Sequence, residues 1–380
     1  MHSKKILILG GSHRDIPLIK AAKELGYFVI TLGNRVDYKG HQYADKYFLI
    51  DFNDMEKIRE IIEKEKVSYL VPGSGEISYL NTVLLSKEFN IGSFDEIEIA
   101  KLIHNKWQFK KFCIEHNISV PKGIYYQKNK NLTSLKLPIV VKPTTLSGGR
   151  GIEVVQSFDQ LYQSLETASR ISDEIFLEEY IQGKLIAYSV FLKDQKIVYA
   201  FSGVDETYLN PYLITTAYPI KLNPNIEKKL NTNIEKIAKL LKLVDGMFHL
   251  QVIVNETIPY IIDVTRRIPG DFYPYLIEKV NGVEYSKAVI KAYIGQKVQN
   301  EFVAKYRYFI VRYVVMPSKN GIYQGLEVDD RIKNKIIIKF DLLEPGYRID
   351  NYLSTQVAIF LIKDINDISL IKKSIKVIVE

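Results

Sequence analysis

The strongest constraint on the fold is an alternation of short apolar strands and helices along the first 71 residues. The strands are expected at residues 5–9, 27–32, 47–50 and 68–71. The helical segments between them include one closed by Gly26, a residue type that commonly ends helices, and one at 54–66. Strands that alternate with helices at short intervals predict a parallel sheet covered on both faces, so we expect an α/β domain over residues 1–100.

Beyond residue 100 the pattern changes to a mixed, α+β arrangement. Strands dominate from 136 to about 262, and runs of β-branched and aromatic residues broken by Gly and Asp predict a small strand-rich lobe at 301–380. Helices are expected at residues 101–116, 157–168, 225–241 and 285–294. The pattern therefore predicts boundaries near residues 100 and 300.

Charge and composition indicate which partners to expect. The 380 residues include 52 Lys and Arg against 44 Asp and Glu, a net charge of +8, but the basic residues are scattered among glutamates, as in 56–65. No basic tract with interleaved aromatic residues suggests nucleic acid, and no apolar run approaches the roughly 20 residues of a membrane span. The chain begins in a strand without the apolar core of a signal peptide, and its single cysteine, Cys113, suits a reducing compartment. We expect a cytoplasmic protein that binds anionic small molecules, and neither nucleic acid nor a membrane.

The segment 138–155 combines a buried strand, a lysine and a glycine-rich loop. Residues 139–141 are apolar and β-branched, Lys142 follows them, and three glycines precede a second β-branched run. A lysine supplies a point charge for phosphate, and glycines let backbone N–H groups approach an anion without interference from Cβ atoms. A glycine cluster is also a common structural turn, and this one is neither a Walker loop nor a dinucleotide fingerprint. The interpretation therefore depends on the motifs around it.

Other motifs occur in a fixed order around this segment. Lys106 opens an amphipathic helix, and Glu178–Gly183 follows an apolar strand. Two later segments, Gly246–Gln251 and Tyr260–Gly270, carry polar residues on predicted strands. Together these motifs resemble the ATP-grasp superfamily, in particular its carboxylate–amine ligase branch, related to biotin carboxylase and carbamoyl phosphate synthetase. The resemblance covers nearly the whole chain and implies an N-terminal α/β domain, a two-lobed grasp over 101–300 with its lid lobe at about 120–180, and a small C-terminal lobe.

The resemblance implies that ATP is bound and assigns residues to its binding. Lys106 and Lys142 would contact the phosphates. The glycines that would cover the phosphates are Gly148, Gly149 and Gly151. Glu178 and the backbone of the next three residues would receive the adenine, namely Glu179, Tyr180 and Ile181. The alternative for the two lysines is that they are solvated surface charges. This alternative is weaker for Lys142, because Lys142 ends an apolar strand. The alternative for Glu178 is an exposed strand end. Ribose contact stays unassigned, because Leu185 stands where related proteins often have a glutamate.

The resemblance also implies a Mg²⁺ site, with Mn²⁺ as an alternative metal. The metal-ligating positions fall on Gln251, Asp263 and Thr265, and Arg267 falls on the position that steadies the transferred phosphoryl group. Strand alternation places Asp263, Thr265 and Arg267 on one face. One carboxylate and two neutral oxygens bind Mg²⁺ less tightly than the two carboxylates and one amide usual in the family. Either the ATP phosphates supply the missing charge, or the site is degenerate and only binds nucleotide.

Substrate candidates lie at the predicted carboxyl ends of the N-terminal strands, where ligands of parallel sheets bind. They are Ser12, His13, Arg14 and Glu76. Arg266 points to the other face of its strand if the strand continues, and is included because a bend toward Pro269 would bring it in. Solvent-facing turns are the competing interpretation for the candidates at the strand ends. Two aromatic segments, Asp205–Tyr212 and Asp271–Tyr275, are either loops that gate the second substrate or packing.

The activity that the resemblance implies is an ATP-dependent ligase, with Arg267 and Lys142 as its catalytic residues. A carboxylate would be phosphorylated to an acyl phosphate, which an amine attacks to give an amide, with release of ADP and phosphate. No side-chain nucleophile is needed, because phosphoryl transfer rests on positioning and charge neutralisation. The alternatives are a kinase or carboxylase that acts on a small anionic metabolite, and a degenerate nucleotide-binding subunit. The expected partners are a small carboxylate and a small amine, and a homodimer is one expected assembly.

Overall fold

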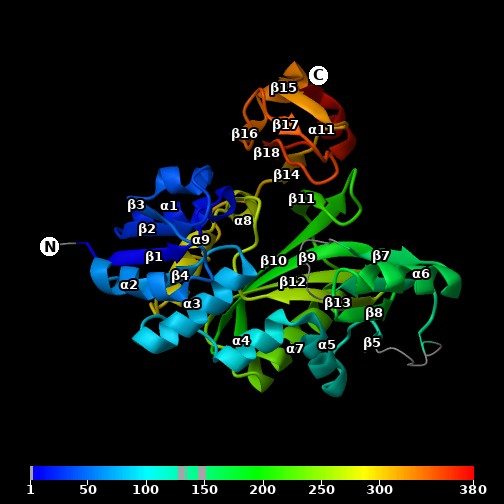
Figure 1. The fold of residues 1–380 in the computed structure, drawn as a ribbon, viewed down its shortest axis with the longest axis horizontal. Helices are drawn as coiled ribbons and strands as arrows, with labels where there is room; N and C mark the ends of the chain where they lie inside the picture. The colour runs from blue at the N-terminus through cyan, green and yellow to red at the C-terminus, as the bar shows by residue number, and fades with distance from the viewer. Residues whose placement is uncertain (1–2, 127–131, 133–134, 144–150) are drawn as a thin grey trace.

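The computed structural model describes residues 3–126, 132, 135–143 and 151–380. Figure 1 shows the N-terminal elements at one end of the molecule, a long central sheet that runs toward a small sheet at the other end, and the C-terminal strands above the middle. The N-terminal sheet is parallel, and the remaining sheets are antiparallel. The expected combination of α/β and α+β architecture is therefore confirmed.

Four parallel strands form the N-terminal sheet, in the order β3-β2-β1-β4. The strands are β1 Lys5–Leu9, β2 Phe28–Gly33, β3 Lys46–Leu49 and β4 Tyr69–Pro72. The helices are α1 Ile16–Glu24, α2 Met55–Glu65 and α3 Glu76–Phe89, with 3-10 helices η1 His13–Asp15 and η2 Lys39–Tyr43. Residues 6–9 of β1 are fully buried, which is typical of an inner strand with helices on both faces of its sheet.

The expected single helix over 101–116 is wrong. The structure has α4 Ile97–His104 and α5 Lys106–Glu115, separated at Asn105. Asn105 has extended backbone angles, and its side chain accepts a hydrogen bond from the backbone N–H of Gln108, so it caps the start of α5. The break places Lys106 at the first position of α5, where free N–H groups favour a bound anion.

The central sheet has eight antiparallel strands in the order β13-β12-β9-β10-β11-β14-β18-β16. Five of them are β9 Lys184–Lys193, β10 Lys196–Thr207, β11 Ile214–Pro219, β12 Gly246–Asn255 and β13 Ile258–Thr265. The other three are β14 Ile310–Val315, β16 Ile336–Asp341 and β18 Ala358–Lys363. The C-terminal segment thus extends the central sheet, and β14 joins it through the pairing of Arg312 with Ala217 in β11.

The two faces of the central sheet are covered by different helices. They are α7 Pro224–Leu240, α8 Tyr273–Asn281 and α9 Tyr285–Tyr293. The face with Tyr188 and Phe248 packs with α7 in one hydrophobic cluster. The opposite face, with Ala187 and Met247, packs with α8 and α9 in another. Because successive strand residues alternate between the faces, His249 and Gln251 of β12 lie on the α8 and α9 side.

The lid sheet is a separate antiparallel sheet in the order β5-β8-β6-β7. Its elements are β5 Gly123–Tyr125, β6 Ile139–Pro143, β7 Glu153–Val155, β8 Ile175–Glu179 and the helix α6 Phe158–Ser169. Leu161 and Leu165 of α6 pack on the apolar side chains of β6 and β8. The ring centroids of Trp107 in α5 and Phe176 in β8 are 5.3 Å apart, so α5 contacts the lid sheet directly.

The last part of the chain forms a small three-stranded sheet beside β14 and β18. Its elements are β15 Gly321–Val328, β17 Arg348–Ile349, β19 Ile375–Val379, and the helices α10 Asp330–Lys333 and α11 Ile368–Ser374. Tyr323, Ile332 and Ile371 pack against Val311 and Phe360 of the central sheet in one cluster. The C-terminal lobe is therefore anchored by a shared hydrophobic core.

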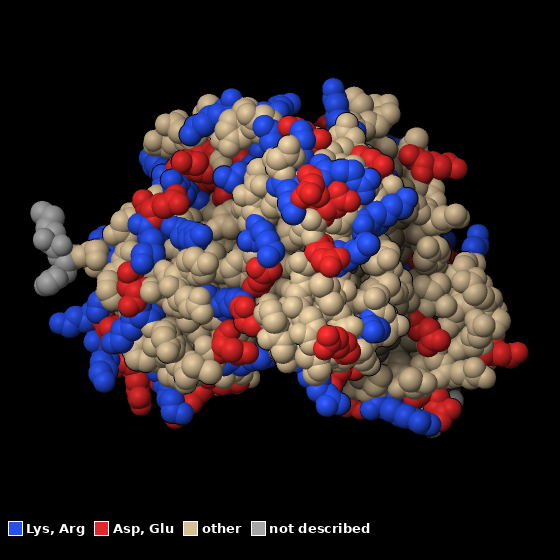
Figure 2. All heavy atoms as spheres, turned by 90° about the horizontal axis from the view of Figure 1, so that it is seen from above, with Lys and Arg blue, Asp and Glu red and all other residues tan. Residues whose placement is uncertain are grey.

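Acidic and basic side chains are intermixed over the face that Figure 2 shows. Among the described residues, no helix combines the length and the apolar character needed to cross a membrane. The predicted core position of Cys113 is confirmed, because the residue is fully buried, and burial raises the pKa of its thiol to about 12.

A buried ion pair joins the connection between α3 and α4 to the end of β13. Arg266 Nε donates to Asp95 Oδ2 at 2.8 Å, and the other two guanidinium nitrogens donate to the carbonyls of Met247 and Val244. Asp95 Oδ1 accepts from the backbone N–H of Val244, and Asp95 and Arg266 are each 4% exposed. The pair therefore ties the N-terminal domain to β12 and β13.

We predict that Asp95→Ala lowers the free energy of unfolding by about 3 kcal/mol, because it leaves the buried Arg266 guanidinium without a counter-charge. Urea titration followed by circular dichroism measures the change. Glu96→Ala is the matched control, since the neighbouring Glu96 pairs with Lys87 at the exposed surface and should leave the transition nearly unchanged. Equal effects of the two substitutions would contradict the assignment.

Candidate functional site

Two lysines share one carboxylate where α5 meets the lid sheet. Lys110 of α5 donates to Glu178 Oε2, and Lys142 of β6 donates to Glu178 Oε1. The side chains of Glu178 and Lys110 are only 4% and 6% exposed, whereas that of Lys142 is 16% exposed. Lys142 is thus the partner that solvent or a ligand reaches more readily.

Burial and charge act in opposite directions on this group. Burial alone would raise the pKa of Glu178, but Lys142 and Lys110 together lower it to about 2. Burial lowers the pKa of Lys110 to about 8, against the attraction of Glu178. Glu178 is therefore an anion at neutral pH, and it fixes both ammonium groups.

The residues predicted to contact adenine lie at the end of β8. The backbone N–H groups of Glu179 and Tyr180 donate to the carbonyls of Lys122 and Pro138, each at 2.9 Å. Of the three predicted backbone positions, Ile181 is the one whose N–H has no partner among the described residues. Since two lysines occupy the Glu178 carboxylate, we propose that it positions Lys142 and that the backbone around Ile181 receives the base.

The glycine-rich loop is only partly described. Gly148 and Gly149 lie outside the described residues. Gly151 has a φ of +72°, a conformation that suits glycine and that other residues rarely adopt. Its assignment to the phosphate cover stays a prediction.

The predicted metal ligands lie on neighbouring strands in register. Gln251 of β12 pairs with Asp263 of β13, and His249 pairs with Thr265. Paired residues of adjacent strands share a face, so the amide of Gln251, the carboxylate of Asp263 and the hydroxyl of Thr265 are neighbours. These are oxygen donors that suit Mg²⁺, but the set holds a single carboxylate. No group of three His, Cys, Asp or Glu residues that could hold a metal occurs in the described part of the chain.

Arg267 lies just beyond the end of β13, where three parts of the fold meet. Its backbone N–H donates to the hydroxyl of Thr265, and its Nε is buried without an acceptor among the described residues. Burial lowers the pKa of Arg267, while Asp263 and Glu76 raise it. Desolvation raises the pKa of Glu76, and Arg267 and Lys106 oppose this rise. The starts of α3 and α5 therefore bring Glu76 close to Arg267 and Lys106 close to Glu76.

One buried carboxylate positions the substrate candidates at the end of β1. Asp15 accepts from the backbone and the hydroxyl of Ser12, each at 2.9 Å, and from the backbone N–H of Ser74 at 2.7 Å. Ser12 in turn caps η1 by accepting from the N–H of Arg14. A Cβ atom at Gly10 would lie within 2.9 Å of Asp15 and Gly73, so the close approach of the two strand ends requires glycine.

His13 and Arg14 both point to Asp271, in the segment that follows Arg267. Arg14 Nε donates to Asp271 Oδ1 at 3.0 Å, and His13 Nε2 lies 3.3 Å from the same oxygen. Burial would raise the pKa of Asp271, but Arg14 and His13 hold it well below its usual range. Asp271 and Phe272 both have positive φ values, of 52° and 59°, so the turn holds backbone strain that places Asp271 against the N-terminal domain.

Arg266 does not face these candidates. All three of its donor nitrogens are bound to Asp95 and to backbone carbonyls, on the opposite side of the strand from the metal-ligand candidates. We therefore propose a structural role for Arg266. The prediction that Asp205 belongs to a loop is wrong, since Asp205 and Glu206 are part of β10.

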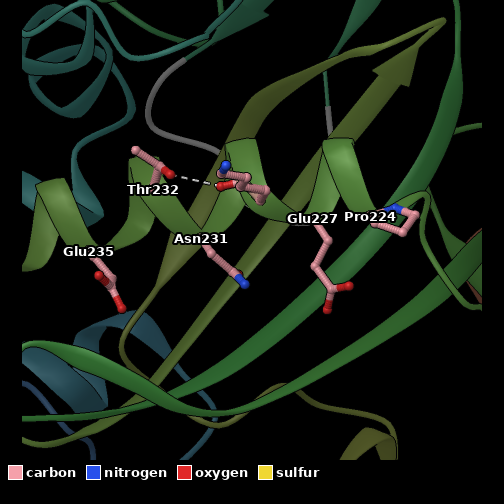
Figure 3. A pocket seen from close by; sticks show the side chains of 6 residues that line it. Pro224, Glu227, Asn231, Thr232 and Glu235 are labelled. Carbon is pink, nitrogen blue, oxygen red and sulfur yellow. Dashed lines mark hydrogen bonds between the residues drawn. The ribbon is translucent and has the colours of Figure 1, made fainter.

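A surface recess of about 330 Å³ along α7 lies apart from this site. Figure 3 shows Glu227, Asn231 and Glu235 projecting from α7, and the Thr232 hydroxyl bonded to a backbone carbonyl of the same helix. Asn231 accepts from the hydroxyl of Tyr188, which lies on the α7 face of the central sheet. The recess is thus across the sheet from His249 and Gln251.

Sequence reasoning missed Lys110 and left Asp271 undecided. A signal for Lys110 was available, because it stands among Phe109, Phe112 and Cys113 on the buried side of an amphipathic helix, where an unpaired lysine is costly. No local signal identifies Asp271 as the partner of His13 and Arg14, because the contact joins segments about 257 residues apart.

Comparisons with known proteins agree with this architecture. Residues 113–294 match the family model of the D-ala D-ala ligase C-terminus. The large chain of carbamoyl phosphate synthase from Clostridium beijerinckii is 24% identical over 326 residues, which cover 78% of this chain. The match spans only 30% of the length of that relative.

Two solved structures share the whole fold. An L-amino acid ligase from Bacillus licheniformis superposes with a TM-score of 0.85 at 15% identity, over 100% of this chain and 99% of the other. The biotin carboxylase domain of a 2-oxoglutarate carboxylase from Hydrogenobacter thermophilus, in complex with MgADP, ADP and bicarbonate, superposes with a TM-score of 0.77 at 18% identity. It covers 95% of this chain and 86% of the other. These matches, and the fold that the chain shares with the two solved structures, agree with the resemblance of its motif order to the ATP-grasp superfamily.

We predict that the protein binds Mg²⁺ weakly without nucleotide and tightly with it, because Asp263 is the single carboxylate of the predicted ligand set. Isothermal titration calorimetry with MgCl₂, with and without ADP, measures both affinities. Gln251→Glu adds a second carboxylate and should raise the affinity for Mg²⁺ alone by about tenfold. Strong Mg²⁺ binding by the unmodified protein in the absence of nucleotide would count against this site.

We predict that Lys110→Met weakens ADP binding by about tenfold, the loss expected for one charge-assisted hydrogen bond of roughly 1.5 kcal/mol. Without Lys110, Glu178 depends on Lys142 alone and competes with the phosphates for it. Calorimetry with ADP measures the change, and the fluorescence of Trp107 reports whether α5 keeps its contact with the lid sheet. Lys111→Met, on the exposed side of the same helix, should bind like the unmodified protein. An unchanged ADP affinity in folded Lys110→Met would show that Lys110 does not support Lys142.

Proposed function

We propose that this protein is an ATP-dependent ligase that phosphorylates a small carboxylate and transfers the acyl group to an amine. The products are an amide, ADP and phosphate. The observation that carries the proposal is the environment of Arg267. Its buried Nε lacks an acceptor among the residues that the structure describes, and its electrostatic neighbours come from both the central sheet and the N-terminal domain. Such a cation suits an anion that is shared between a phosphoryl donor and a substrate held at the N-terminal strand ends.

The remaining residues fit this role. Lys142 and Lys106 would bind the phosphates, with Glu178 and Lys110 holding Lys142 in place. Asp263, Gln251 and Thr265 would hold Mg²⁺, which neutralises phosphate charge when it is bound. His13, Arg14 and Glu76 lie at the N-terminal strand ends, and we propose that Arg14 and Glu76 contact the carboxylate substrate or orient it. The likeness to an L-amino acid ligase supports an amino acid or a similar small carboxylate.

A degenerate nucleotide-binding subunit is the second candidate. It is favoured by the single carboxylate among Gln251, Asp263 and Thr265. ATP turnover distinguishes the two, because a subunit that only binds nucleotide releases no ADP with any acceptor. The domain boundaries near residues 100 and 300, a homodimeric assembly and a cytoplasmic location stay predictions.

We predict that the protein, incubated with ATP, hydroxylamine and each common L-amino acid in turn, forms a hydroxamate, because hydroxylamine traps an acyl phosphate. Arg267→Lys should lower the rate of hydroxamate formation by about 100-fold while ADP affinity changes little, since a point charge cannot reproduce the planar fork that steadies the transferred group. Colorimetric hydroxamate detection and calorimetry with ADP measure the two effects. Release of AMP and pyrophosphate would replace the acyl phosphate with an adenylate.

A further inference from the structure

A second group of buried polar side chains lies between the central sheet and α8. Asp205 of β10, Arg312 of β14 and Tyr273 of α8 are 6%, 3% and 4% exposed. Asp205 Oδ1, Arg312 Nε and the Tyr273 hydroxyl all lack hydrogen-bond partners among the described residues. Leaving buried polar atoms unpaired costs free energy, so a group of three indicates that something else binds there.

Strand register brings Asp205 and Arg312 onto the same face. Ala217 of β11 pairs with Asp205 on one side and with Arg312 on the other. The two charged residues are therefore two strand spacings apart, about 10 Å between Cα atoms, with the short side chain of Ala217 between them. A Cβ atom at Gly203 would lie 2.7 Å from the Tyr273 hydroxyl, so that hydroxyl sits directly over the backbone of β10.

The same face continues to the predicted metal ligands. Asp263 pairs with Gln251, Gln251 with Ala187, and Ala187 with Gly203. Along this row, Ala187 of β9 separates Gln251 from Gly203 of β10, the strand that carries Asp205. On the other side of the group, Arg312 Nη1 donates to the backbone carbonyl of Asp271 at 3.2 Å. The carboxylate of the same residue accepts from Arg14. The group therefore borders the proposed phosphoryl-transfer site on two sides.

The carboxylate of Asp205 forms no hydrogen bond or ion pair with another residue that the structure describes. Asp271 is held by His13 and Arg14, Asp263 belongs to the predicted metal ligands, and Glu76 lies in the field of Arg267 and Lys106. Burial raises the pKa of Asp205 to about 7, although Arg312 opposes the rise. A carboxylate with this environment is suited to exchange a proton with a bound amine near neutral pH.

We propose that Asp205, assisted by the Tyr273 hydroxyl, binds the amino group of the acceptor substrate, and that Nε of Arg312 donates to an acidic group of the same molecule. The acceptor class is therefore a small amine that also carries a carboxylate, such as an amino acid. This inference rests on the proposed ligase function and adds the second substrate to it.

The reaction step follows from this placement. The acceptor ammonium passes one proton to the Asp205 carboxylate, and the freed nitrogen attacks the carbonyl carbon of the acyl phosphate. The new C–N bond forms as the C–O bond to the phosphoryl group breaks, and phosphate leaves with that electron pair. The second amine proton leaves to solvent to give the neutral amide.

Two acceptors test the proposal on the full chain. Hydroxylamine is uncharged at neutral pH and needs no carboxylate to bind or deprotonate it, whereas an L-amino acid acceptor is an ammonium ion. Reactions contain ATP, MgCl₂ and each common L-amino acid as acyl donor. Hydroxamate is measured by colour and the dipeptide by mass spectrometry. The variants are Asp205→Asn and Tyr273→Phe, with Glu206→Gln as the control, because Glu206 is on the opposite face of β10 and contacts Tyr218.

Asp205→Asn should leave the rate of hydroxamate formation within about threefold of that of the unmodified protein. It should lower the rate of dipeptide formation by about 100-fold, the effect expected when a general base is lost. Tyr273→Phe should show the same split with a smaller loss, and Glu206→Gln should change neither product. An equal loss of both products in a variant with an unchanged melting temperature would overturn the proposal, and so would no loss of either. If the unmodified protein forms neither product, the ligase function itself fails, and this inference fails with it.

Discussion

The site depends on how a few carboxylates hold a larger group of basic side chains. Glu178 accepts from two lysines, and Asp271 accepts from Arg14 and lies 3.3 Å from the ring of His13. Because an isolated buried charge is costly, each of these carboxylates fixes the cations that it serves. Arg267 differs from them, since its buried Nε has no acceptor in the described part of the chain. This donor suits a bound anion, and a transferred phosphoryl group is proposed to lie there.

The central sheet sets the distances within the site through its register. Asp263, Gln251, Ala187 and Gly203 form one row across four strands, and the small residues Ala187 and Gly203 let α8 pack closely beside the polar end of the row. Strand spacing is fixed by backbone hydrogen bonds, and side chains held by such a scaffold are more precisely placed than side chains on loops. The same row explains why the recess along α7, on the other face, is a poor candidate for the site.

Local sequence patterns predicted most helices and strands, but they did not predict which distant side chains contact each other. The strand and helix positions followed from periodicity, but the cap at Asn105 was missed because the apolar pattern continues on both sides of it. Lys142 could be singled out because it ends an apolar strand. The contacts of Asp271 with His13 and Arg14 could not be predicted, because they depend on the docking of distant segments of the chain. Asp205 was assigned to a loop on account of nearby aromatic and proline residues, whereas pairing with β11 makes it part of a strand.

The proposed nucleotide and amine sites use different sheets. The lid sheet carries Lys142 and Glu178, so a movement of the lid relative to the central sheet would move these two proposed phosphate-site residues. Asp205 and Arg312 belong to the central sheet itself, and the pairing through Ala217 fixes their separation. The amine site therefore keeps its distance from the predicted metal ligands whatever the lid does. A ligase gains from this division, because the acyl phosphate can be covered and released without moving the group that presents the amine.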